Sequence, residues 1–168
     1  VLAMALSALA VHAAPEEVTY LLPAPATLPA FAPWMLAQQN GYYADENLRV
    51  TFVAGKGGVD VAKQIGAGNA VIGGAIGDTP IVVRANGIPV RDVAVRGAGP
   101  LTQLAVHESS NIKNTKDMKG KTLTVIAYTD TTYYALLGSL RKAALGNGDV
   151  DIQAAGPSGV WQLFTANK

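Results

Sequence analysis

Residues 48–76 read LRVTFVAGKGGVDVAKQIGAGNAVIGGAI, and this segment gives the clearest indication of fold class. Leu48–Val53 has the composition of a strand. Val59–Ile65 has apolar residues at near-helical spacing, and Gly66 and Gly68 follow as a stop. The almost wholly apolar run Val71–Ile76 predicts a second, buried strand. Strand, helix and strand in this order predict a β-α-β unit with a parallel sheet.

The same alternation continues on both sides of this unit. Val18–Leu22 is a further predicted strand, and a helix of two to three turns is expected between Pro33 and Asn40, with proline in front and Asn-Gly behind. After Ile76, Thr79 is expected to cap a helix that runs through Ala85. Val90–Val95 then returns as a strand. The predicted class is therefore α/β, with mainly parallel sheets covered by helices.

A second unit of the same kind is predicted from residue 102 onward. Its predicted elements are a strand at Thr102–His107, a lysine-rich turn at Lys113–Gly120, a strand at Thr122–Ala127, a helix capped by Thr129, a strand at Val150–Ala154 and a helix at Ser158–Ala166. In the helix after Thr129, apolar residues recur every three or four positions through Ala144. No strand follows the last helix, so this second lobe is expected to be truncated.

The composition excludes several classes of function. Charged residues make up 15% of the 168 residues and the net charge is +1, so the chain lacks the basic surface that nucleic-acid binding requires. Cysteine is absent, which removes disulfides, thiolate metal sites and cysteine nucleophiles. We expect no nucleic-acid partner.

The first residues have the character of a secretory leader. VLAMALSALAVHA, residues 1–13, is small and apolar, and Val11-His12-Ala13 fits a small-x-small cleavage pattern. The usual basic segment is missing, so we interpret residues 1–13 as part of a signal peptide, with a mature chain beginning near Ala14. A core helix is the alternative. Export without cysteine is compatible with the bacterial periplasm, which is the location we expect.

No catalytic or metal-binding constellation is apparent. His107 is the single histidine beyond the leader and has no serine or acidic companion at a spacing typical of catalysis. Gly55-Lys56-Gly57-Gly58 lacks the spacing and the Lys-Ser/Thr pair of a phosphate loop. The sequence therefore predicts no catalytic residue, no metal and no cofactor.

Small polar residues and glycines gather where predicted strands give way to helices. The carboxyl ends of parallel strands face one crevice, where free N–H groups and helix dipoles suit a small polar or anionic ligand. The candidate ligand-binding residues are Thr27, Trp34, Gly57, Gly58, Asp78, Thr79, Thr129, Asp130, Thr131 and Thr132. Taken singly, Asp78, Thr79 and Thr129 are also explained as helix caps, and Trp34 as a core residue.

Three segments carry a resemblance to a known family. GYYADENLRV (41–50), Gln64–Val82 and KDMKGKTL (116–123) resemble conserved segments of the solute-binding proteins of ABC importers, in the nitrate, sulfonate, taurine and thiamine-precursor superfamily. The resemblance extends over residues 17–168 and corresponds to about the first half of such a protein. It implies a type II periplasmic-binding fold with lobes at residues 14–108 and 109–168 and hinge strands near His107–Ile112.

The resemblance also implies a mechanism and partners. A small solute (a sulfonate, taurine, nitrate or a pyrimidine-like compound) would be held between two lobes that close about a hinge, and an inner-membrane permease would recognise the closed form. The full-length protein is expected to be a monomer. Enzymes that synthesise a pyrimidine precursor of thiamine belong to the same superfamily and are the alternative, but their pattern includes a cysteine-rich motif.

Three positions depart from the family pattern. Asn47 stands where glycine is usual, and asparagine tolerates the left-handed backbone that such a turn needs. Asn69 begins a segment that lacks the usual acid. Asp130 lies where relatives hold the ligand with Gly, Ser or Thr. A carboxylate pointing into the cleft would repel a sulfonate and favour an amine or aminopyrimidine; the alternative is an outward-pointing first-turn acid.

Overall fold

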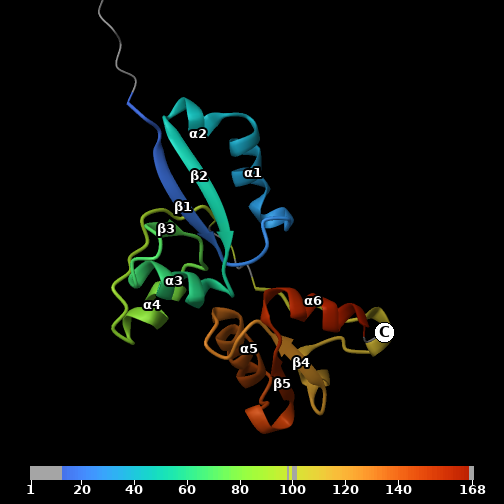
Figure 1. Ribbon diagram of the computed structural model, residues 1–168. Coiled ribbons are helices and arrows are strands. Elements are labelled where there is room, and N and C mark those ends of the chain that lie inside the picture. The colour runs from blue at the N-terminus through green and yellow to red at the C-terminus, as the bar shows by residue number, and fades with distance from the viewer. Residues whose placement is uncertain (1–12, 98, 100–101, 167–168) are drawn as a thin grey trace, which may run out of the picture.

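The computed structural model describes residues 13–97, 99 and 102–166, which form two parallel sheets, each with its own helices (Figure 1). We call residues 16–84 the first lobe and residues 115–166 the second lobe. The predicted leader, residues 1–13, lies almost entirely outside the described residues. The α/β class and the parallel sheets predicted from the sequence are confirmed.

The sheet of the first lobe has three parallel strands. β1 (Glu16–Leu22) lies between β2 (Leu48–Ala54) and β3 (Ile72–Gly73). β1 and β2 pair over their full length, from Glu16 opposite Leu48 to Leu22 opposite Ala54. Their carboxyl ends point toward the second lobe (Figure 1). Any residue that follows these strands is therefore brought to the boundary between the lobes.

Helices cover both faces of this sheet (Figure 1). The 3-10 helix η1 (Pro29–Phe31), α1 (Ala32–Gln39) and α2 (Tyr42–Asp45) lie on one side, and α3 (Gly58–Gly66) and α4 (Thr79–Arg84) on the other. α3 is amphipathic: Val59, Val61 and Ala62 are buried against Leu21, Ala70, Val83 and Val90. This packing fixes the N-terminus of α3 beside the end of β2.

The predicted strands after β2 are shorter than expected or absent. Of Val71–Ile76, only Ile72 and Gly73 pair with β1. Val90–Val95 and Thr102–His107 form no strand, although both contain β-branched residues, because no neighbouring strand pairs with them. Val93 and Val95 are accordingly 77% and 76% exposed. β-branched composition alone therefore does not make a strand without a partner.

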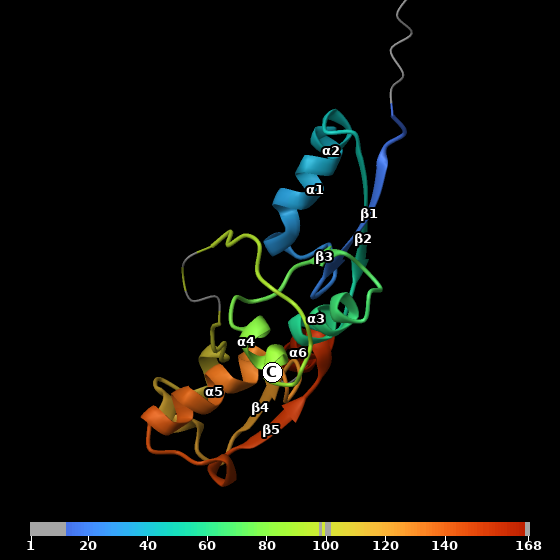
Figure 2. The ribbon, with the colours of Figure 1, turned by 90° about the vertical axis from the view of Figure 1, so that its left-hand side faces the viewer.

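The connection between the lobes is also not a strand. The predicted hinge near His107–Ile112 contains a 3-10 helix, η2 (Glu108–Ser110), followed by Asn111 in the left-handed conformation (φ 58°). Figure 2 shows the described residues that follow α4 as an extended strap beside the first lobe.

The second lobe is one parallel β-α-β unit and a further helix. β4 (Thr122–Val125) pairs with β5 (Asp151–Ala154), joined through α5 (Thr131–Lys142) and a 3-10 helix, η4 (Asn147–Asp149). α6 (Gly156–Ala166) follows. The core consists of Met118, Val125, Leu136, Leu140, Leu145 and Val150. The helices predicted after Thr129 and at Ser158–Ala166 are confirmed, with small shifts at their ends.

The entry to the second lobe is held by a capping box. In the 3-10 helix η3 (Thr115–Met118), Asn114 accepts a hydrogen bond from the Lys116 N–H, and Asp117 Oδ2 accepts from the N–H groups of Lys113 and Asn114 at 2.9 and 3.0 Å. These two backbone donors lower the pKa of Asp117 from its ordinary value. The lysine-rich segment predicted as a turn is thus ordered by its own side chains.

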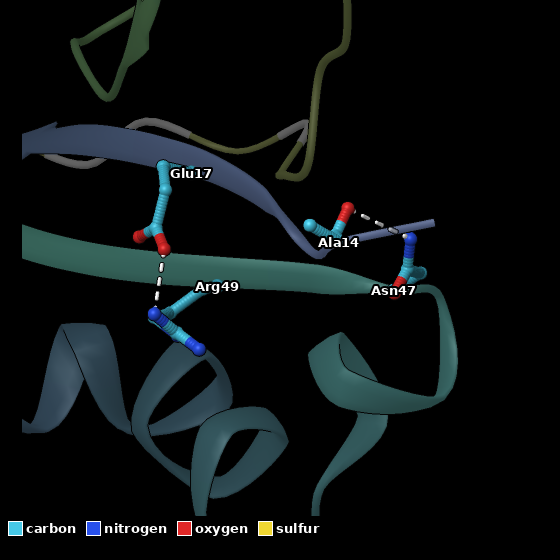
Figure 3. A network of polar contacts seen from close by, with 4 residues as sticks. All are labelled: Ala14, Glu17, Asn47 and Arg49. Atoms are coloured by element: carbon cyan, nitrogen blue, oxygen red, sulfur yellow. Dashed lines mark hydrogen bonds and ion pairs between the residues drawn. The ribbon is translucent and has the colours of Figure 1, made fainter. Parts of the chain in front are cut away.

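The turn before β2 confirms the interpretation of Asn47. Its φ is 55°, the left-handed region, where asparagine is tolerated far better than most residues. Figure 3 shows Asn47 Nδ2 donating to the Ala14 carbonyl (3.4 Å) and Arg49 Nη1 paired with Glu17 Oε1 at 2.7 Å. The side chains of that ion pair are 66% and 63% exposed, so it contributes little to stability.

We predict that Asn47→Ala lowers the free energy of unfolding by about 1 kcal/mol, because alanine disfavours the left-handed conformation. Asn47→Gly is expected to leave it unchanged or raise it slightly. Urea denaturation measures both. Asn40→Ala is the matched control, since Asn40 has right-handed backbone angles (φ −82°) and should tolerate alanine. Equal losses for the Asn47 and Asn40 alanine variants would contradict this prediction.

Candidate functional site

Gly57 lies where the two lobes touch, and Gly58 follows it as the first residue of α3. Both are buried, and Gly57 has φ 107° and ψ 168°, angles that are essentially reserved for glycine. A Cβ atom on Gly57 would lie 3.2 Å from Ile126 Cγ2 and 3.3 Å from Asp130 Oδ2, both in the second lobe. The chain therefore uses the missing side chain of Gly57 to bring the end of β2 against the region after β4.

Asp130 supplies the charged group at this junction. It is 3% exposed and caps α5: Oδ1 accepts hydrogen bonds from the Thr132 N–H at 3.0 Å and from Thr132 Oγ1 at 2.8 Å. The predicted cap, Thr129, is wrong by one residue, because the chain turns into the helix at Asp130. Oδ2 is directed toward Gly57. The carboxylate is therefore turned toward the first lobe and not outward.

Two buried threonines flank these residues. Thr131, the first residue of α5, is 2% exposed, and its Oγ1 has no hydrogen-bond partner within the described part of the chain. Thr79 is 1% exposed, and its Oγ1 lies 3.1 Å from the position that a Cβ on Gly58 would occupy. The prediction that Thr79 caps α4 is wrong by one residue, because Thr79 is the first residue of the helix and Asp78 precedes it. A buried hydroxyl without a hydrogen-bond partner, such as that of Thr131, is unusual in folded proteins.

The structure thus brings six of the predicted residues together at one place: Gly57, Gly58, Thr79, Asp130, Thr131 and Thr132. They come from the N-terminal ends of α3, α4 and α5, where the helix dipoles are positive. The N–H groups of Gly57, Thr79 and Thr132 already donate to the Pro23 carbonyl, the Ile76 carbonyl and Asp130 Oδ1. The N-termini, the hydroxyls and one carboxylate can together hold a small ligand that both donates and accepts hydrogen bonds.

The other four predicted residues are placed differently. Thr27 and Asp78 are exposed, and the Asp78 side chain makes no capping hydrogen bond although it precedes α4. Thr129 is exposed in the turn before α5. Trp34 is half-buried among other rings. The structure does not place these four against the Gly57–Asp130 contact, and their role in binding stays a prediction.

Trp34 belongs to an aromatic cluster on the α1 face of the first sheet. Its ring lies 5.8 Å from the rings of both Tyr20 and Phe31, and the Arg96 guanidinium lies 3.3 Å from its centroid. Burial raises the pKa of Tyr20, while the Trp34 indole and the Arg96 charge oppose that rise. The sequence analysis missed Arg96, because no spacing links residue 96 to residue 34.

His107 lies outside the junction. Its ring stacks on Phe164 of α6 (4.1 Å between centroids), and its Nε2 lies 2.7 Å from the Phe164 carbonyl oxygen. These contacts give it a structural role. Within residues 13–97, 99 and 102–166, no cluster of three or more metal-ligating side chains is present, and no helix is long and apolar enough to cross a membrane.

Two open grooves occur elsewhere on the surface. One, of about 580 Å³, is lined by His107, Glu108, Ser109 and Thr165. The other, of about 590 Å³, lies between η3 and the end of α5 and is lined by Asn114, Thr115, Lys116, Ser139, Lys142 and Ala143. Both are shallow and neither includes the junction residues. In this structure the junction itself is tightly packed.

Comparison with known proteins agrees with this architecture. Residues 28–166 match the family described as NMT1/THI5 like. The chain belongs to that family. Together with the structural neighbours, this match places it in the type II periplasmic-binding superfamily, as the N-terminal portion of such a fold, and confirms the resemblance seen in the sequence.

Two curated relatives of this NMT1/THI5-like chain have the same name, 4-amino-5-hydroxymethyl-2-methylpyrimidine phosphate synthase. The protein from Schizosaccharomyces pombe is 31% identical over 106 residues, or 63% of this chain, and the one from Legionella pneumophila is 28% identical over 95 residues, or 56%. This chain spans 30% of the length of each.

Two solved structures of similar fold are those of binding proteins. The alkanesulfonate-binding protein SsuA from Xanthomonas axonopodis, bound to MOPS, aligns with a TM-score of 0.60 and 22% identity over 92% of this chain and 53% of its own. The periplasmic aliphatic sulphonate-binding protein SsuA from Escherichia coli aligns with a TM-score of 0.65 and 21% identity over 90% of this chain and 48% of its own. At these identities the likeness shows the fold.

Proposed function

We propose that this NMT1/THI5-like chain belongs to the substrate-binding component of an ABC importer and takes up a small polar solute between its two lobes. The contact of Gly57 with Ile126 and Asp130 carries the proposal, because it unites residues of both lobes at helix N-termini. A site divided between two lobes suits a protein that holds a solute and releases it by moving the lobes. The fold shared with sulfonate-binding proteins supports this reading.

Opening and closing of the lobes follows from the burial of the site. Thr79, Asp130 and Thr131 are each at most 3% exposed, so a solute reaches them only when the lobes separate. A solute that contacts both lobes stabilises the closed form by the difference between its affinities for the two forms. Between α4 and η3, the described residues have little regular structure apart from the 3-10 helix η2, and this part of the chain would bend.

The importer proposal includes the location and the partners. The protein would act in the periplasm as a monomer and would deliver the solute to a permease in the inner membrane. The lobes would be residues 14–108 and 109–168, and residues 1–13 would be part of a cleaved leader.

A pyrimidine-precursor synthase is the second candidate, and the two curated relatives favour it. Such an enzyme would bind a pyrimidine in the same junction and transform it. Within the described residues, the junction holds the Asp130 carboxylate and hydroxyls, while His107 lies against α6. This arrangement offers hydrogen bonds to a ligand but no paired nucleophile and base.

A solute panel separates the two candidates. Taurine, alkanesulfonates, nitrate, simple amines and aminopyrimidines are added singly, and the melting temperature and the recovered solute are both measured. The importer proposal predicts that at least one solute raises the melting temperature and is recovered unchanged. Chemical conversion of any solute would favour the enzyme. No shift with any solute would contradict both.

A further inference from the structure

Asp130 is a buried carboxylate that lacks a positive partner. It is 3% exposed, and it belongs to neither of the ion pairs in the described residues, which are Arg49–Glu17 and Lys119–Asp149. Lys56 is close in sequence to Gly57, but its side chain is exposed and joins no ion pair. Buried charges are normally paired, because removing a charge from water is costly.

The carboxylate also has unused capacity to accept hydrogen bonds. Both hydrogen bonds that the Asp130 carboxylate accepts within the described residues come from Thr132 and end on Oδ1. Oδ2 faces Gly57 across the lobe boundary, and the neighbouring Thr131 Oγ1 is buried without a partner. Asp130 Oδ2 and Thr131 Oγ1, at the start of α5, therefore have no hydrogen-bond partner among the described residues.

We propose that Asp130 is the specificity-determining residue of the junction and selects solutes that present a protonated nitrogen: an amine, an amidine or a guanidine. This inference rests on the proposed binding function and adds the charge class of the solute. A cationic N–H group would donate to Oδ2 and neutralise the buried charge, whereas a sulfonate or nitrate would be repelled by it.

The same residue links solute charge to closure. Closing the lobes buries an uncompensated carboxylate when no solute is present, which disfavours the closed form. A cationic solute removes that cost and so shifts the population toward closure, while an anion of equal size does not. Asp130 therefore makes closure depend on the charge of the solute as well as on its fit.

Asp130→Asn tests this inference with little disturbance to the fold. Asparagine is as good a helix cap as aspartate and keeps an Oδ1 that accepts from Thr132, while the charge is lost and an NH2 donor replaces the acceptor Oδ2. Asp130→Ser keeps the cap with a smaller side chain. Asp45→Asn, at an exposed position on α2, is the control for loss of one negative charge.

Calorimetric titration with benzamidinium, ethylammonium, guanidinium, benzoate and ethanesulfonate is the measurement. The wild type and Asp45→Asn should bind at least one cation more tightly than either anion, and both Asp130 variants should weaken that binding by about 30-fold or more. Preferential binding of an anion, or cation binding unaffected by Asp130→Asn, would overturn the inference while leaving solute binding intact. No binding of any probe, together with no shift in the solute panel, would overturn both.

Discussion

Replacing Gly57 by alanine should weaken binding of any solute that the protein takes up by about 100-fold, or roughly 2.8 kcal/mol. The added Cβ would lie 3.2 Å from Ile126 Cγ2 and 3.3 Å from Asp130 Oδ2, so the lobes could not approach as closely as they do in this structure. The backbone angles of Gly57 add strain for any other residue. Calorimetry with the best solute of the panel measures the loss.

The controls separate lobe closure from local strain. Gly41→Ala also places alanine at a positive φ (81°), but a Cβ there meets nothing within 4 Å. It should cost stability without changing the affinity. Small-angle scattering should show that Gly57→Ala keeps a larger radius of gyration than the wild type when solute is added. Wild-type affinity in Gly57→Ala would show that the contact does not control closure.

Much of the fold follows from local sequence patterns. β1, β2, β4 and β5 fall where apolar and β-branched runs predict strands, and α3 and α5 fall where apolar residues recur at helical spacing. Asn47 was correctly expected in the left-handed region. These features depend on residues close together in the chain, and that is why sequence reasoning finds them.

The same local patterns predict strands at Val90–Val95 and Thr102–His107, and there the prediction is wrong. A strand exists only with a hydrogen-bonded neighbour, and the identity of that neighbour is not encoded in the run itself. Among the described residues neither run has one. Val93 and Val95 stay exposed for this reason, although their composition favours a strand.

In the candidate site too, features set by local sequence could be predicted, and contacts between distant segments could not. Gly57, Gly58 and Asp130 were found because glycines and small polar residues at strand ends are typical of binding sites in α/β folds. Ile126 and Arg96 were missed, since their contacts with Gly57 and Trp34 join segments about 60 residues or more apart. The sequence does not determine whether the Asp130 carboxylate points into the junction or outward. In the structure it faces Gly57, because the second lobe packs against that residue.

Leu140→Ala should cause the largest loss of stability, about 3 kcal/mol, because it removes a side chain that is 1% exposed from the core of the second lobe. That core has six buried residues, all between 118 and 150, and shares none with the clusters of the first lobe. The loss is therefore expected to fall on the second lobe alone. Hydrogen exchange should show faster exchange in α5 and β4 and unchanged protection in β1 and β2.

Leu163→Ala is the matched control for that substitution. Leu163 is 41% exposed on α6, so the same change should alter the free energy of unfolding by no more than about 0.5 kcal/mol. Faster exchange in β1 and β2 of Leu140→Ala would show that the lobes unfold as one unit. Independent unfolding is what hinge closure needs, because lobes that hold their own cores can separate and rejoin without losing their internal structure.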